Sequence, residues 1–278
     1  MSTPPARTQE THRVPTRLGR LHVRVLGTGP ATVLWPSMFV DGRTFDPLLP
    51  LLPGRRLVVV DGPGLGASEP LSRRSTIAEA ADAAQDLLTG AHAADLGLDG
   101  PVDWVGNAFG GHVGYELARR PGLLRSLAAV SAPTEPVPPA LRRQIRLLAP
   151  MLRWLGPVGP VRAAILTALL TEASAADPGI RTAVLGSVGT PTRRSLALAL
   201  RSFIVDRADV TSGLADIAVP CLYVAGDDRG DWTPGAAAAA AALTPSATAV
   251  TIPGSRTLVP LEQPAALARE LRAFWSRG

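Results

Sequence analysis

The chain has 278 residues, and its 28 basic residues, all arginine, exceed its 23 acidic residues by five. Hydrophobic residues make up 46% and charged residues 18%, which is the composition of a globular protein and excludes a disordered chain. The absence of lysine excludes Schiff-base chemistry and a P-loop lysine. A single cysteine excludes an internal disulfide framework. The arginines are scattered along the sequence, so we expect no nucleic-acid partner.

Short apolar runs alternate with helical patterns along most of the chain. Residues 1–12 are polar and are expected to form a disordered leader. Thr76 and Glu79 form a capping box that opens a helix running towards Ala94. The apolar runs are typical of a parallel sheet covered by helices, and predict strands at Leu21–Leu26, Thr32–Trp35, Leu57–Asp61, Val102–Val105, Ser126–Val130, Cys221–Ala225 and Thr248–Ile252.

The stretch 135–215 contains no convincing strand. Its apolar spacing predicts helices at Leu141–Leu155, Val161–Thr171 and Thr192–Ile204. A helical insertion between two strands is expected to cover the carboxyl edge of the sheet as a lid. The predicted organisation is therefore a leader of residues 1–12, an α/β core of 13–134 and 216–278, and a lid of 135–215. No signal peptide or membrane span is visible, so we expect a cytoplasmic protein with no membrane partner.

The turn after the predicted strand Val102–Val105 carries the clearest motif. Gly106–Gly111 has the Gly-x-x-x-Gly frame of a nucleophile elbow, followed by a helix. With three further segments, the chain from about residue 20 to 276 resembles the α/β-hydrolase family. This resemblance implies a mostly parallel eight-stranded sheet flanked by helices, with a helical lid. The segments that resemble the oxyanion loop, the loop after the fourth strand and the catalytic histidine loop are Leu34–Arg43, Val60–Ser68 and Pro253–Pro264.

The catalytic residues that the resemblance implies are not all present. Ala108 stands at the elbow position where the family has its nucleophile, and an alanine has no nucleophilic atom. Thr257 stands where the family has its histidine, five residues before Glu262. The acid of the triad corresponds to Asp228 or Asp231, and the spacing leaves both open. One engineered substitution would not explain two losses, which favours a natural member without a triad.

An oxyanion hole is made of backbone N–H groups and can survive the loss of the nucleophile. The resemblance places one donor at Phe109 and the other in the loop at Ser37 and Met38. The hydroxyl groups of Ser37 and Thr257 are further candidates for contact with a bound carbonyl. Asn107, the single asparagine of the chain, either contacts a ligand or supports the strained turn.

Several side chains are candidates for proton transfer. His112 follows Ala108 by four residues, on the same helical face; the alternative is a buried histidine held by a backbone carbonyl. Asp61 ends a strand at the expected pocket edge, where it serves as a base or orders the nearby loops. Asp228 or Asp231 can instead activate water directly.

Aromatic residues near the expected cleft indicate a pocket for an apolar small molecule, although each can also be a core residue. We find no metal-ligand cluster and no dinucleotide fingerprint, so no metal or other cofactor is expected. The chain is expected to act as a monomer or homodimer. Besides Met38 and Phe109, the candidate pocket residues are Trp35, Phe39, Trp154 and Trp232.

Three functional hypotheses follow from these residues. The first is a non-hydrolytic enzyme that cyclises, isomerises, decarboxylates or changes a carbon–carbon bond in an apolar carbonyl compound, with oxyanion-type stabilisation. The second is a binding protein that kept the pocket and lost catalysis. The third is an atypical hydrolase in which an aspartate activates water.

Overall fold

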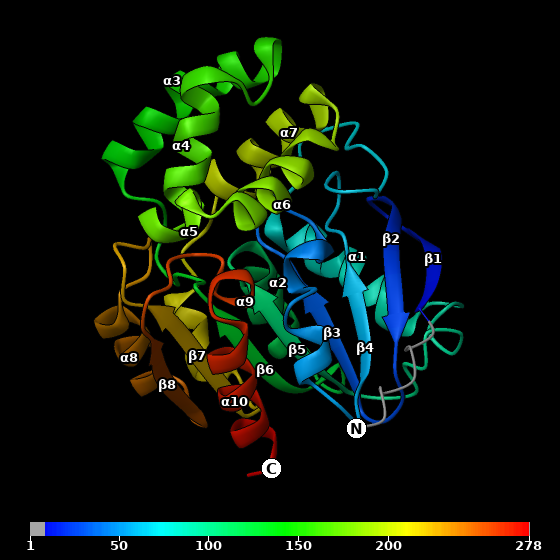
Figure 1. The fold of residues 1–278 in the computed structure, drawn as a ribbon. Coiled ribbons are helices and arrows are strands. Elements are labelled where there is room, and N and C mark those ends of the chain that lie inside the picture. The colour runs from blue at the N-terminus through cyan, green and yellow to red at the C-terminus, as the bar shows by residue number, and fades with distance from the viewer. Residues whose placement is uncertain (1–8, 278) are drawn as a thin grey trace, which may run out of the picture.

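A computed structural model describes residues 9–277 as an eight-stranded sheet with helices on both faces (Figure 1). The strand order is β1-β2-β4-β3-β5-β6-β7-β8. The pairs β1–β2 and β2–β4 are antiparallel and the remaining pairs are parallel, as predicted for the α/β-hydrolase fold. The strands are β1 (Gln9–Thr16), β2 (Gly19–Leu26), β3 (Ala31–Trp35), β4 (Arg56–Val60), β5 (Val102–Asn107), β6 (Leu124–Val130), β7 (Cys221–Gly226) and β8 (Ala247–Ile252).

The prediction of a disordered leader is wrong for residues 9–12, because they belong to β1. This strand pairs with β2 along its whole length, from Gln9 opposite Leu26 to Thr16 opposite Gly19. Its residues are mostly exposed and polar, so hydrophobic patterning gave no signal for an edge strand stabilised by backbone hydrogen bonds. The rest of the predicted leader, residues 1–8, lies outside the described residues.

Alternating side chains of the central strands supply two apolar layers. Leu34 of β3 and Val105 of β5 belong to the layer that includes Leu267 of α10 (Pro264–Trp275). The neighbouring residues Val33 and Trp104 belong to the larger layer that packs against α1 (Ile77–Thr89) and α2 (Phe109–Ala118). Helices α8 (Pro234–Ala242) and α9 (Val259–Glu262), with short turns at Gly42–Phe45, Leu49–Leu51 and Thr211–Asp216, complete the core.

Five helices between β6 and β7 lie together above the carboxyl ends of the parallel strands (Figure 1). We call residues 135–215 the cap segment. Two of its helices are absent from the sequence prediction, because α5 has only five residues and the apolar residues of α6 form no clear stripe. None of the helices in the described part of the chain is long and apolar enough to cross a membrane. The cap helices are α3 (Pro139–Leu155), α4 (Gly159–Leu169), α5 (Glu172–Ala176), α6 (Pro178–Gly189) and α7 (Arg193–Leu200), the last continued by a π-helical turn at Arg201–Val205.

The predicted capping box is confirmed at the start of α1. The Thr76 hydroxyl accepts the Glu79 N–H, and the Glu79 carboxylate accepts the Thr76 N–H. The helix ends at Thr89, short of the predicted Ala94, because Gly90 has extended backbone and terminates it.

Replacing Thr76 with Ala removes one half of this capping box. We expect the free energy of unfolding to fall by about 1 kcal/mol, measured by urea unfolding followed by circular dichroism. Thr89→Ala is the matched control at the other end of the helix, where the hydroxyl bonds only the carbonyl of Gln85. Equal losses in the two variants would contradict the capping account.

Candidate active site

The turn between β5 and α2 has the strained geometry of a nucleophile elbow, with alanine at its apex. Ala108 has φ 46° and ψ −103°, a left-handed conformation that costs a residue other than glycine about 1–3 kcal/mol. The Ala108 N–H donates to the carbonyl of Val130 on β6 at 2.7 Å, which holds the turn against the sheet. The strained backbone is therefore present without a reactive side chain.

Close backbone approaches fix this turn. A Cβ atom on Gly106 would lie 2.1 Å from the carbonyl oxygen of Gly110. A Cβ atom on Gly110 would lie 2.1 Å from the carbonyl oxygen of Trp35 on β3. Any larger side chain would push the elbow away from the sheet. These two glycines explain the Gly-x-x-x-Gly spacing of the sequence in physical terms.

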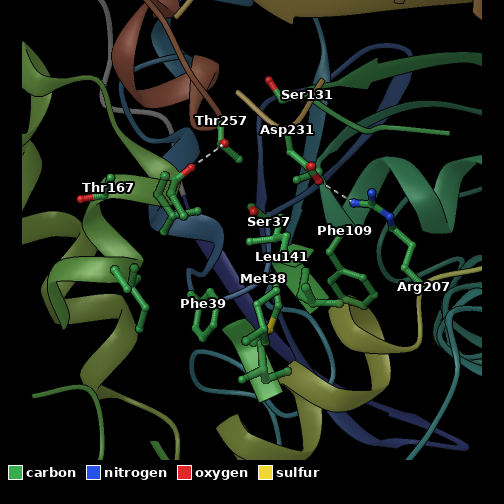
Figure 2. A pocket seen from close by; sticks show the side chains of 18 of the residues that line it. Ser37, Met38, Phe39, Phe109, Ser131, Leu141, Thr167, Arg207, Asp231 and Thr257 are labelled. Carbon is green, nitrogen blue, oxygen red and sulfur yellow. Dashed lines mark hydrogen bonds and ion pairs between the residues drawn. The ribbon is translucent and has the colours of Figure 1, made fainter. Parts of the chain in front are cut away.

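A cavity of about 470 Å³ lies between the elbow and the cap segment (Figure 2). Its floor includes Ala108 and Phe109, and helices α3 and α4 provide much of its wall. The lining is mainly apolar, which suits an apolar small molecule. Polar groups enter it at a few positions, namely Ser37, His112, Ser131, Gln144, Thr167, Arg207, Asp231 and Thr257.

Two backbone N–H groups at the floor are available to a ligand. Phe109 is the first residue of α2, where a helix leaves its N–H groups unpaired and carries partial positive charge. Within residues 9–277 neither the Phe109 N–H nor the Met38 N–H makes a hydrogen bond. The Ser37 hydroxyl likewise has no hydrogen-bond partner there. All three residues line the cavity, as the predicted oxyanion hole requires.

His112 lines the cavity, but its environment keeps it neutral. Its Nε2 lies 2.8 Å from the carbonyl oxygen of Pro133, so Nε2 carries the proton. Complete burial lowers the pKa of His112 to about 3, and the nearby Arg207 guanidinium contributes in the same direction. A neutral imidazole with so low a pKa is a weak base and has no proton to donate as an imidazolium near pH 7. This geometry matches the alternative of a buried histidine held by a backbone carbonyl.

Asp61 lies outside the cavity and connects strand β2 to two loops. Its carboxylate accepts hydrogen bonds from the ring of His22 at 3.0 Å, from the Gly42 N–H at 2.8 Å and from the Ala67 N–H at 2.9 Å. Burial alone would raise the pKa of Asp61, but these hydrogen bonds outweigh it and lower the pKa. The arrangement corresponds to the loop-ordering interpretation of Asp61.

The sequence left open whether Asp228 or Asp231 corresponds to the triad acid, and the structure places the two side chains at different sites. Asp231 lines the cavity and accepts a hydrogen bond at 2.8 Å from Arg207 (Figure 2). Asp228 faces a separate groove, where it pairs with Arg256 at 3.1 Å. Arg207 is buried and also donates to the carbonyl of Glu135 at 3.0 Å. Sequence reasoning missed Arg207 because it stands in no motif and reaches the cavity only through the course of the cap segment.

Asn107 and Thr257 join the elbow to the loop before α9 and to the cap. The Asn107 side-chain amide donates to the carbonyls of Thr257 at 2.7 Å and Val130 at 3.1 Å, and Asn107 does not line the cavity. The Thr257 hydroxyl, at the cavity edge, donates to the carbonyl of Ala168 on α4 at 2.9 Å (Figure 2). These contacts support a structural role for Asn107.

Of the five aromatic residues predicted to line the pocket, Phe39 and Phe109 do so and the three tryptophans do not. Trp35 is fully buried in the core and stacks on Trp104, with ring centroids 5.3 Å apart. Trp232 is buried against Tyr223. Trp154 is 70% exposed. The prediction was wrong for these three tryptophans, because proximity in sequence to a cleft segment does not fix the side to which a side chain points.

The residues described by the structure contain no group of three or more His, Cys, Asp or Glu side chains that could hold a metal ion.

The eight-stranded sheet and the elbow together define an α/β-hydrolase fold, and sequence comparison shows the family. A model described as "Alpha/beta hydrolase family" matches residues 27–270, so the chain belongs to the alpha/beta hydrolase family. It is similar to a pimeloyl-[acyl-carrier protein] methyl ester esterase of Xanthomonas oryzae pv. oryzae, with 30% identity over 247 residues covering 84% of this chain and 90% of the relative. The corresponding esterase of Xanthomonas axonopodis pv. citri is 29% identical over the same length and coverage.

Solved structures show the same fold. A thermophilic esterase from Thermogutta terrifontis superposes with a TM-score of 0.83 at 23% identity, covering 97% of this chain and 98% of the esterase. The enol-lactonase from Burkholderia xenovorans LB400 also gives 0.83, at 20% identity, covering 95% and 100% of the two chains.

The low pKa of His112 predicts a pH-dependent stability. Unfolded His112 has its ordinary pKa near 6.5, whereas the folded value is about 3. Between these values the unfolded state binds more protons, so stability is complete above pH 6.5 and falls as the pH drops towards 3, by at most about 1.4 kcal/mol per pH unit.

His112→Gln keeps a donor for the Pro133 carbonyl and removes this titration. Urea unfolding between pH 7 and 4 should show that the free energy of unfolding of this variant depends less steeply on pH. The difference in slope corresponds to at most one bound proton, about 1.4 kcal/mol per pH unit. His92→Gln, at an exposed site, is the control and should keep the wild-type slope. A wild-type slope in His112→Gln would contradict the assignment.

Proposed function

We propose that this protein is a divergent hydrolase that cleaves an ester or lactone of a largely apolar small molecule by direct attack of water, without an acyl-enzyme. The observation that carries the proposal is the combination of an elbow backbone of catalytic shape, unpaired N–H groups beside it, and Ala108 at its apex. The family membership and the esterase names of the relatives support hydrolysis.

The two backbone N–H groups and Asp231 each have a role in this reaction. The carbonyl oxygen of the substrate accepts hydrogen bonds from the N–H groups of Phe109 and Met38. Asp231 takes a proton from water as the water oxygen bonds to the carbonyl carbon, and the carbonyl oxygen becomes the oxyanion. The tetrahedral intermediate then expels the alkoxide, which takes the proton from Asp231. The products are the free acid and alcohol, and the enzyme returns to its starting state.

Arg207 assists Asp231 through position and charge. Its guanidinium holds one carboxylate oxygen at 2.8 Å, which leaves the other oxygen for water. The ion pair with the buried Arg207 fixes the orientation of the Asp231 carboxylate. Arg207 is thus a positioning residue in this proposal.

Non-hydrolytic chemistry, the first hypothesis from the sequence, has less support. It assigned proton transfer to His112 or an aspartate, and His112 is neutral, bonded to Pro133 and a poor base. The curated relatives are esterases, whereas nothing in the comparisons favours a cyclase, isomerase or lyase.

Asp231→Asn removes the proposed base with little change in shape. We expect kcat/KM for p-nitrophenyl hexanoate to fall at least about 100-fold, the usual contribution of a general base. Asp228→Asn is the matched control, because Asp228 belongs to the same loop and also pairs with an arginine, but lies outside the cavity. Its activity should stay within about twofold of wild type.

Asp231→Asn also leaves Arg207 without its ionic partner, so thermal melting is measured for every variant. Asp231→Glu keeps a carboxylate and should retain more activity than Asp231→Asn at similar stability. Equal activity in wild type and Asp231→Asn would contradict the role of Asp231.

Non-catalytic binding is the second candidate, because the cavity contains no nucleophile at the elbow and its only histidine is neutral. It predicts that an apolar ligand from a metabolite extract is recovered unchanged from the purified protein. Ester turnover no faster than in a heat-denatured sample would favour binding over hydrolysis.

A further inference from the structure

The charged side chains of the outer part of the cap segment, residues 136–171, are all basic. Residues 136–171 contain no aspartate or glutamate. The same stretch carries arginine at 142, 143, 146, 153 and 162. The first four lie on α3 and Arg162 lies near the start of α4, and both helices are at one end of the molecule (Figure 1). Arg193 of α7 joins them, since it donates to the carbonyl of Trp154 at 2.9 Å.

These arginines have no acidic partner. In the described part of the chain, none of the six forms an ion pair, although many arginines elsewhere do. The Arg153 guanidinium lies 5.0 Å from the ring centroid of Trp154, and the Arg162 side chain donates to the carbonyl of Pro157 at 3.4 Å. The cap surface therefore carries uncompensated positive charge.

Large apolar side chains are exposed on the same surface. Leu147 and Trp154 are each 70% exposed, although solvent-facing helix positions usually carry polar residues. Arg143, Leu147, Pro150 and Trp154 follow one another at spacings of three and four residues and so share one face of α3. Leu141, Leu155 and Val158 of the cap are also exposed. Among the described residues outside the cap, Leu243 is the only large apolar side chain that is exposed.

We propose that this surface, defined by Arg143, Arg146, Leu147, Trp154, Leu155 and Val158, binds peripherally to a membrane rich in anionic lipid. Uncompensated arginines attract lipid phosphates, while exposed leucine and tryptophan enter the boundary between headgroups and acyl chains. Tryptophan favours that boundary because its ring is apolar and its N–H is polar. The prediction of no membrane partner rested on the absence of a spanning segment, and a peripheral surface needs none.

We infer an anionic membrane as the partner because this surface combines unpaired arginines with exposed apolar side chains. Arginines alone would fit any polyanion, and an apolar patch alone would fit many proteins. Apolar and basic side chains alternating on one exposed helix are typical of helices that lie in a lipid interface. The opposite side of α3 supplies Ile145 and Leu152 to the cavity wall, so the same helix separates the proposed lipid surface from an apolar cavity.

The test is flotation of the full-length protein with vesicles. We expect it to float with vesicles of phosphatidylglycerol and phosphatidylcholine in equal amounts, to stay behind with pure phosphatidylcholine, and to lose binding in 0.5 M NaCl. Trp154 should blue-shift its fluorescence on binding. Arg143→Glu with Arg146→Glu should weaken the partition coefficient at least about tenfold, as should Leu147→Ser with Trp154→Ser.

Matched controls lie at distant places on the surface. Leu243→Ser removes an exposed leucine from the end of α8, and Arg277→Glu reverses an exposed charge at the C-terminal end, far from α3 (Figure 1). Both should float like wild type. No flotation with anionic vesicles, or equal binding by the cap variants and the controls, would overturn the proposal. Salt-sensitive retention on immobilised polyglutamate without flotation would indicate an acidic protein partner and would also overturn it.

Discussion

The whole site depends on the close approach of the elbow backbone to β3 and β6. Gly106 and Gly110 allow contacts that any side chain would prevent, and the Ala108 N–H is tied to Val130. This packing holds Ala108 in a conformation that alanine by itself disfavours. The same packing leaves the Phe109 N–H at the cavity floor. The chain thus has the strained backbone of a nucleophile elbow with Ala108 at its apex.

Electrostatics divides the cavity into one charged corner and a neutral remainder. Burial and Arg207 keep His112 uncharged, so the imidazole serves as a hydrogen-bond donor to Pro133. Asp231 and Arg207 form the ion pair of the cavity. An apolar cavity strengthens interactions with these few polar groups, because water competes less well there. In the proposed reaction, this corner orients the carbonyl group while the remaining surface contacts the apolar body of the substrate.

Local patterns predicted the parts of the structure that local physics determines. The capping box at Thr76, the glycine frame of the elbow and the apolar strands follow from hydrogen bonding, close approach and burial, which short sequences encode. The choice between Asp228 and Asp231, the participation of Arg207 and the exposure of Trp154 depend on how the cap segment packs over the sheet. That packing joins residues far apart in the chain, so spacing alone could not reveal it.

In the proposed reaction, carbonyl chemistry at this elbow proceeds without a covalent intermediate. Intact-protein mass spectrometry of samples quenched during turnover of p-nitrophenyl hexanoate tests it most directly. The account predicts continuous release of p-nitrophenol while the protein keeps its unmodified mass at every time point. A stoichiometric acyl adduct that forms and decays at the rate of turnover would contradict it.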